Sequence, residues 1–159
     1  MSLAAELHLD RPFSDLRHET LLNIVHTAGL FSAVGEALFR PFGLTQAQFN
    51  VLFALKYKIG PITQAGLGKR LVVSRASITS VLDKLERKQL VVRESVSGNR
   101  RIYHVSLTAK GRAMIEQVEP LYRERIHAAL ADLSDAECVN VIRYMERMRA
   151  QTAKMRGGA

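Results

Sequence analysis

The side chains of this chain that could do the most chemistry are cationic, and they concentrate in one stretch. Between Ile62 and Arg101 there are nine Lys and Arg residues against three acids, which gives +6 of the formal net charge of +8. Surface salt bridges would mix the two signs more evenly, so the excess favours a polyanionic partner over a merely solvated face.

No enzymatic motif accompanies these cations. The sequence contains no HExxH, no phosphate-cradling glycine loop and no GxSxG elbow. His18 and His26 lie eight residues apart, about 12 Å along a helix, which is too far to chelate one metal ion. The single cysteine, Cys138, cannot form an internal disulfide, and its helical context favours a small buried hydrophobe over a redox switch between subunits. We therefore expect no enzyme, cofactor or metal.

Length and composition favour one folded domain. The chain has 159 residues, of which 47% are hydrophobic, enough for a single core. We find no apolar run near the roughly 20 residues of a membrane span, and the N-terminal sequence does not resemble a signal peptide. The expected protein is cytoplasmic, with no membrane partner.

Two short helices are predicted within the basic stretch. Thr63 can cap a helix over Gln64–Leu71, and Ser74 can cap a second over Arg75–Lys88, because each hydroxyl can accept from free amides of the first turn. Only Val72 and Val73 separate the first helix from the Ser74 cap of the second, and apolar residues at helical spacing can pack the two helices together. This spacing predicts a helix-turn-helix.

A β-hairpin and flanking helices complete the predicted fold. Strand-like alternation over 90–95 and 101–107 surrounds turn formers at 97–99. Before the helix-turn-helix, helices are expected over 15–39, with Ser14 as N-cap, and over 46–55, after a Thr45–Gln48 capping box. After the hairpin, Thr108 caps a helix over 109–131, in which Pro120 should cause a kink or break. A Ser134–Glu137 capping box begins the last helix. The predicted class is mainly α with a small β-wing, a winged helix-turn-helix between long terminal helices.

Over nearly its whole length the sequence resembles the MarR family of bacterial winged helix-turn-helix transcription regulators. The stretches that carry the resemblance are LTQAQFNVLFAL (44–55), SRASITSVLDKLERKQLVVR (74–93) and NRRIYHVSLTAKG (99–111). Three features depart from the family pattern. Asn99 replaces the usual Asp of the wing, and Gln89 replaces a Gly that commonly ends the recognition helix. Gly66 and Gly68 each weaken the short helix before it by about 0.8 to 1 kcal/mol relative to Ala. If Gln89 is left-handed, the non-glycine residue costs about 1 kcal/mol.

The resemblance favours duplex DNA as the polyanion and assigns the contacts. Arg75 is the best candidate for reading a base, with a phosphate contact as the alternative, because Arg pairs bidentately with guanine and most protein–DNA hydrogen bonds go to the backbone. The other expected DNA contacts are Ser74, Ala76, Ser77, Thr79 and Ser80 at the start of the recognition helix, Thr63 and Gln64 at a phosphate, Lys84 and Lys88 at flanking phosphates, and Asn99, Arg100 and Arg101 in the wing.

Two of these residues have alternative roles. Lys88 can instead complement the C-terminus of its own helix. The resemblance also implies that one wing arginine meets an acid on the recognition helix, for which Asp83 is the candidate.

The terminal helices are expected to form a homodimer. The chain is expected to be a single domain spanning 1–159, in which 45–108 binds DNA. Segments 12–40 and 109–155 have wide apolar stripes, which a second copy of the chain would cover. The alternative is that these stripes pack within one chain. A dimer implies a pseudo-palindromic operator. The resemblance further implies a repressor released by a small aromatic or phenolic effector, with Arg17, His18 and His26 as candidate pocket residues.

Two alternatives to this function stay open. One is a winged helix that binds RNA or a protein, and the other is a DNA-binding repressor with no effector.

Overall fold

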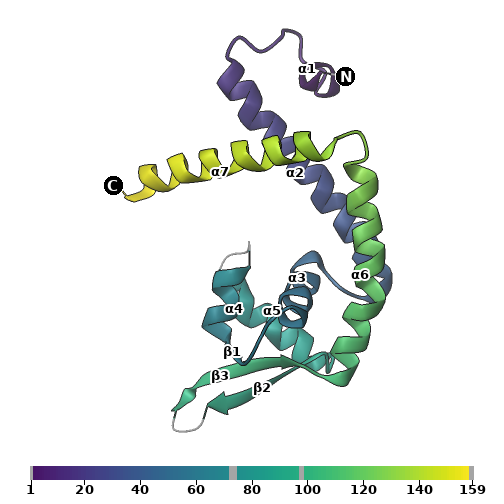
Figure 1. The fold of residues 1–159 in the computed structure, drawn as a ribbon, viewed down its shortest axis with the longest axis vertical. Coiled ribbons are helices and arrows are strands. Elements are labelled where there is room, and N and C mark those ends of the chain that lie inside the picture. The colour runs from purple at the N-terminus through teal and green to yellow at the C-terminus, as the bar shows by residue number, and fades with distance from the viewer. Residues whose placement is uncertain (1, 72–74, 97–98, 158–159) are drawn as a thin grey trace. The chain divides into compact units, whose positions relative to one another are not determined.

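A computed structural model of the chain describes residues 2–71, 75–96 and 99–157 (Figure 1). The chain divides into two compact units, residues 1–121 and 122–159, and each is described by itself. The elements are mainly helical with one small antiparallel sheet, as the sequence predicted. In chain order they are α1 (Leu3–Glu6), α2 (Leu16–Phe39), the 3-10 helix η1 (Arg40–Phe42), α3 (Gln46–Lys56), β1 (Ile62–Thr63), α4 (Gln64–Arg70), α5 (Arg75–Arg87), β2 (Val91–Val96), β3 (Asn99–Leu107), α6 (Ala109–Ala129) and α7 (Asp135–Gly157).

The core of the first unit lies where α3, α4, α5 and the start of α6 meet. Helix α5 buries Ile78, Leu82 and Leu85, which recur at helical spacing and therefore share one face. Leu67 of α4 is fully buried as well, so the two short helices pack together as predicted. Burial of each such side chain stabilises the fold by about 1.5–3 kcal/mol. The other fully buried side chains of this core are Phe39, Phe49, Val51, Leu52, Leu90, Val91, Ile115 and Val118.

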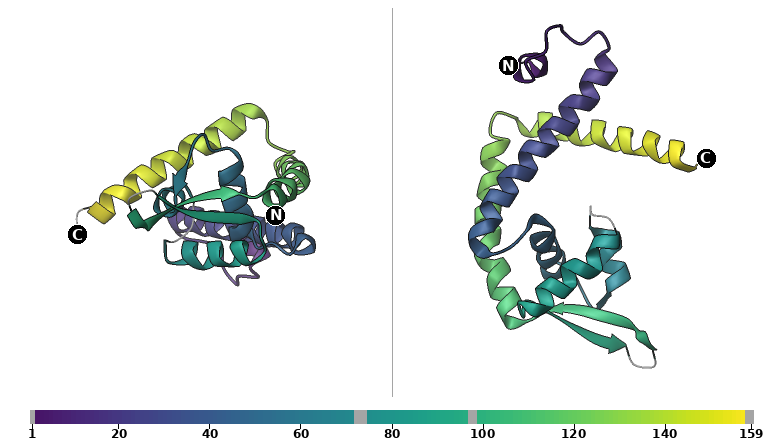
Figure 2. Two further views of the ribbon diagram at one scale, coloured as in Figure 1. Left: turned by 90° about the horizontal axis from the view of Figure 1, so that it is seen from below. Right: turned by 180° about the vertical axis from the view of Figure 1, so that it is seen from behind.

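The sheet has three strands in the order β1-β3-β2, whereas the sequence predicted only the hairpin of β2 and β3. Strand β1 pairs Ile62 with Val105 and Thr63 with His104. A two-residue strand is too short to display alternation, so only its pairing reveals it. The β2–β3 hairpin extends out beyond α4 and α5 (Figure 2).

Side-chain caps fix where the helices begin. The Thr45–Gln48 capping box is present, and the hydroxyls of Thr63 and Thr108 accept from the amides three residues on, at 3.1 and 3.0 Å. Ser134 and Glu137 form the predicted capping box of α7. The N-cap of α2 is Asp15 rather than Ser14: its carboxylate accepts from the Arg17 amide at 2.8 Å, and an anion also suits the positive end of the helix dipole. Ser74 lies outside the described residues.

Helix α6 runs from Ala109 to Ala129 through Pro120, so of the predicted kink or break the break is absent. Two further features differ from the expectations. Helix α1 was not anticipated. The segment Leu16–Phe42 is long and apolar enough, by length and composition, to cross a membrane, although core helices of soluble proteins pass the same criterion.

Candidate nucleic-acid interface

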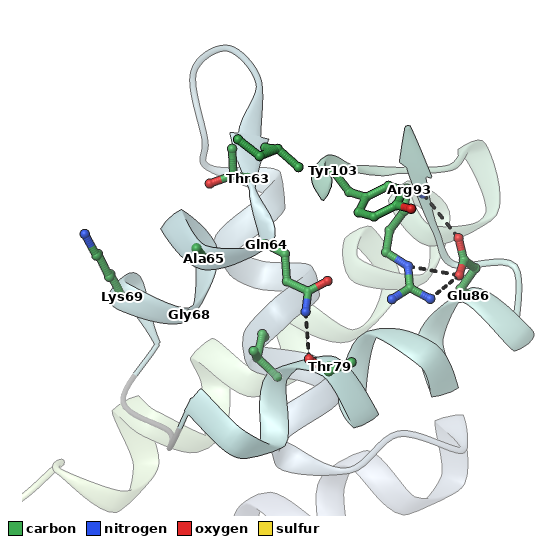
Figure 3. A pocket seen from close by; sticks show the side chains of 11 residues that line it. Thr63, Gln64, Ala65, Gly68, Lys69, Thr79, Glu86, Arg93 and Tyr103 are labelled. Atoms are coloured by element: carbon green, nitrogen blue, oxygen red, sulfur yellow. Dashed lines mark hydrogen bonds and ion pairs between the residues drawn. The ribbon is translucent and has the colours of Figure 1, made fainter. Parts of the chain in front are cut away.

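Helices α4 and α5 are joined by a side-chain hydrogen bond on the side where DNA contacts were expected. The Gln64 amide nitrogen donates to the Thr79 hydroxyl at 2.7 Å, and the two side chains point toward one another (Figure 3). Thr63 uses its hydroxyl to cap α4. These bonds fix the spacing of α4 and α5, and they leave the Gln64 side-chain oxygen available as a further polar contact.

The outer face of α5 is polar and cationic. Because successive residues of a helix turn by about 100°, the face opposite Ile78, Leu82 and Leu85 includes Ser80 and Arg87. Ser80, Lys84 and Arg87 are all exposed. Arg87 was not among the predicted contacts, although its spacing from Ser80, two helical turns, could have indicated it.

Several predicted contacts lie where the structure describes only the backbone. Arg75, Ala76 and Ser77 form the first turn of α5, and Asn99, Arg100 and Arg101 begin β3. The backbone places Arg75, Ala76 and Ser77 at the start of the recognition helix, as predicted, whereas Asn99, predicted in the turn, is already part of the strand. Their contacts remain predictions.

An ion-pair network joins the base of the wing to α5. Arg93 of β2 contacts Asp83 at 2.6 Å and Glu86 at 2.5 Å, and a second bond to Glu86 measures 3.0 Å. Hydrogen bonds to Glu86, and then to Asp83, raise the pKa of the Arg93 guanidinium. Asp83 was expected to pair with Arg100 or Arg101; its partner among the described side chains is Arg93.

A cavity of about 900 Å³, here called the wing pocket, opens between α4, α5 and the wing. Figure 3 shows Gln64 and Thr79 on one side, and Arg93 with Glu86 and Tyr103 on another. Its remaining lining residues are Thr63, Ala65, Gly68, Lys69, Ile78 and Ile102.

A second cavity of about 630 Å³, here called the elbow pocket, lies where α2 and η1 turn into α3 and meet the end of α5. Lys88 donates to the Gly43 carbonyl and to the Gln48 side-chain oxygen, the latter at 3.0 Å. These bonds favour a structural role for Lys88 over a phosphate contact. The pocket is lined by Glu36, Arg40, Gly43, Leu44, Thr45, Gln48, Lys84, Arg87 and Lys88.

A buried carboxylate joins α3 to α6. Glu119 is 4% exposed and accepts from Lys56 at 2.5 Å and from the Tyr57 hydroxyl. The hydrogen bond to Glu119 is the main cause that raises the pKa of Lys56. Sequence reasoning missed this cluster because its members lie more than 60 residues apart.

The predicted effector residues do not line either cavity. The His18 ring packs edge-on against Phe13, and His26 lies 3.5 Å from the Glu6 carboxylate. Arg17 is exposed at the start of α2. In the described part of the chain, no group of three or more His, Cys, Asp or Glu side chains could hold a metal ion.

Known proteins with similar sequences are transcription regulators. The sequence profile of the MarR family matches residues 42–102, from η1 to the middle of the hairpin. The HTH-type transcriptional regulator YkoM of Bacillus subtilis (strain 168) is 32% identical over 129 residues, which cover 79% of this chain and 83% of YkoM.

Solved structures show the same fold. A mutant MarR from E. coli, complexed with operator DNA, is 28% identical, with a TM-score of 0.72 over 85% of this chain and 99% of that one. BpsR of Bordetella bronchiseptica, whose DNA binding is regulated by 6-hydroxynicotinic acid, is 25% identical, with a TM-score of 0.66 over 80% of this chain and 98% of BpsR.

Proposed function

This chain belongs to the MarR family of transcription regulators that bind DNA, and we propose that it acts as a homodimeric repressor on a pseudo-palindromic operator. Its relatives are regulators, and it is not an enzyme. The observation that best supports the proposal is the outer face of α5, where Ser80, Lys84 and Arg87 are exposed while side-chain bonds join α5 to α4 and to β2. A rigidly held cationic helix suits the major groove.

The contacts divide between bases and backbone. Arg75 reads a base edge together with Ser74, Ala76, Ser77, Thr79 and Ser80, while Thr63, Gln64 and Lys84 contact phosphates. Lys88 is left out of this set, because its ammonium group donates to Gly43 and Gln48. Asn99, Arg100 and Arg101 enter the adjacent minor groove from the wing, since a narrow A·T-rich groove attracts cations. Arg93 holds the base of that wing, and Asp83 serves as its anchor.

Exposed apolar helices support the homodimer. On α2, Leu21, Val25 and Phe31 are 56%, 60% and 44% exposed, and on α7 Ile142 is 57% exposed. Apolar faces of this extent are normally covered, and a second copy of the chain would cover them. We assign 12–40 and 109–155 to dimerisation and 45–108 to DNA binding, within a cytoplasmic protein.

Regulation by a small aromatic or phenolic acid is part of the proposal. It is supported by BpsR, whose DNA binding responds to 6-hydroxynicotinic acid. Arg17, His18 and His26 remain the candidate contacts, and a dimer partner would have to complete their pocket.

The dependence of DNA affinity on salt tests the DNA-binding proposal. A dimer that neutralises about ten phosphates gives a slope of log affinity against log salt of about −9. The DNA would be genomic fragments selected by the protein itself. Arg75→Ala and Arg101→Ala should weaken binding, and a flat salt response would favour RNA or a protein as the partner.

The effector proposal has a separate test. Small phenolic acids should release the selected DNA and raise the thermal stability of the free protein, because a ligand that binds the folded state stabilises it. If neither quantity changes across the series, the protein is a repressor without an effector.

A further inference from the structure

The elbow pocket holds more positive charge than its structural contacts use. It is lined by four cations and one acid, Glu36. Lys88 is occupied by Gly43 and Gln48, as described above. Among the described residues, the side chains of Arg40 and Lys84 make no hydrogen bond or ion pair, and the Arg87 side chain uses one nitrogen, on the Asp83 carbonyl at 3.3 Å. Uncompensated like charges around one hollow repel one another, so an anion would relieve them.

Side chains, rather than the start of α3, would recognise this anion. The amides of Thr45, Gln46 and Gln48 already donate to Gln48, Glu36 and Thr45. The α3 N-terminus therefore has little left to offer in its first turn. Gln48 lines the pocket and is 3% exposed, and its side-chain nitrogen donates to no acceptor in the described part of the chain. The available donors are thus two guanidinium groups, one ammonium and one buried amide.

We infer that the elbow pocket binds a phosphate of the DNA backbone outside the bases that α5 reads, with Arg40 and Arg87 as its ligands beside Lys84. This inference rests on the proposed function. Arg87 and Lys84 lie on the exposed side of α5 itself, so a strand that passes α5 continues toward them. Planar guanidinium groups match phosphate oxygens bidentately, and a volume of about 630 Å³ accommodates a phosphate with its sugar and water.

The inference gives α2 and η1 a role in DNA binding. Arg40 belongs to η1, directly after the last residue of α2, and lies outside the helix-turn-helix. A phosphate held by Arg40 and Arg87 together would connect this turn to α5 through the operator.

The test compares Arg40→Gln, Arg87→Gln and the double variant with wild type. Arg11→Gln is the matched control, because it removes the same charge from an exposed residue outside both cavities. The double variant loses the one elbow phosphate of each protomer, so its salt slope should become shallower by about 2 in the dimer, and each single variant should lie between it and wild type. The double variant should also lose roughly tenfold or more in affinity at 0.1 M salt. Arg11→Gln should match wild type.

Shortening the duplex provides an independent measurement. As base pairs are removed from the ends of the selected DNA, wild type should lose affinity at the length where the elbow phosphate disappears. The double variant should show no step at that length, because it has already lost the contact.

The outcomes separate this inference from the proposed function. If the wild-type dimer binds DNA with a steep salt slope and the double variant, folded by circular dichroism, equals Arg11→Gln, the elbow assignment is wrong and the proposed function stands. If wild type itself shows no salt-dependent binding, both are wrong. If inorganic phosphate at fixed ionic strength stabilises wild type but not the double variant, while their DNA affinities agree, the pocket binds a small anion and the DNA assignment is overturned.

Discussion

At the scale of single residues, the arginines of this chain divide by the partners they have. The Arg93 guanidinium is engaged by two carboxylates, whereas the Arg40 guanidinium has no partner among the described residues and that of Arg87 has only a backbone carbonyl. Formal charge alone does not distinguish them. The number of acids within reach decides which arginine is structural and which is available to a phosphate.

Replacing Arg93 tests its structural role. Arg93→Gln leaves Asp83 and Glu86 without their cation, and because these carboxylates are partly exposed we expect a loss of only about 1 kcal/mol in unfolding free energy. Amide exchange in β2 and β3 should accelerate more than in α3. Arg93→Lys keeps the charge but loses the guanidinium geometry, so its unfolding free energy should lie between those of wild type and Arg93→Gln. Unchanged exchange in the wing would contradict the role.

Lys58 differs from these arginines in that its ammonium nitrogen is buried and has no hydrogen-bond partner among the described residues. Burial, and then repulsion from Arg70, lower its pKa. A lysine whose folded pKa lies below its unfolded value destabilises the protein while protonated, and this cost disappears as pH rises from the folded pKa toward the unfolded one. Lys58→Met should therefore raise the melting temperature at neutral pH, by an amount that shrinks as pH approaches 10. A lower melting temperature would show that Lys58 has a partner in solution.

At the scale of elements, the junction between β2 and α6 leaves no room for a side chain at Gly111. A Cβ there would lie 1.9 Å from the Leu90 carbonyl oxygen, which itself accepts from the Thr108 amide. The end of α5, the start of β2 and the start of α6 therefore meet through backbone contact. The spacing of the hairpin from the helices depends on this close approach.

Gly111→Ala should destabilise the protein by about 1–3 kcal/mol or more, because backbone rather than a flexible side chain must move. Gly68→Ala is the matched control: its Cβ would meet only the Ile78 side chain at an ordinary 3.7 Å, so the better helix propensity should stabilise the protein by up to about 1 kcal/mol. Urea unfolding measures both. If Gly111→Ala and Gly68→Ala have equal unfolding free energies, the Leu90 backbone and α6 can move apart at little cost, and the close approach at Gly111 is not required.

At the scale of the whole molecule, exposed apolar helices predict that the single chain is not the functional unit. The exposed face of α2 includes Val25 at 60% and Leu21 at 56%. Each such side chain would gain about 1.5–3 kcal/mol on full burial against a partner. A stable monomer would have to tolerate this surface in water.

Val25→Glu should therefore shift the protein from dimer to monomer at micromolar concentration, because burying an unpaired carboxylate is costly. Sedimentation velocity would report the change in mass. Ile59→Glu, the same kind of apolar-to-acid change at a residue that is 99% exposed and lies outside both dimerisation segments, is the control and should leave the dimer intact. A wild-type protein that sediments as a monomer would instead indicate that its helices pack within one chain.

The sequence by itself determined all the described elements except α1, η1 and β1, and most of their boundaries, because caps and periodicity are local. The Thr45, Thr63, Thr108 and Ser134 caps are where it predicted them, and Gln89 has the left-handed backbone, with φ of 60°, that its position implied. The class of fold and the class of partner followed from the same local signals together with the charge excess.

Only the tertiary structure decided which distant groups meet. It paired Asp83 with Arg93, turned Lys88 toward Gly43, added β1 to the sheet and brought Arg40 beside Arg87. Contacts of this kind depend on how helices and strands pack, and the spacing of residues along the chain does not record that packing. The cationic stretch was therefore visible in the sequence, while the division of its residues between structural bonds and free charges required the fold.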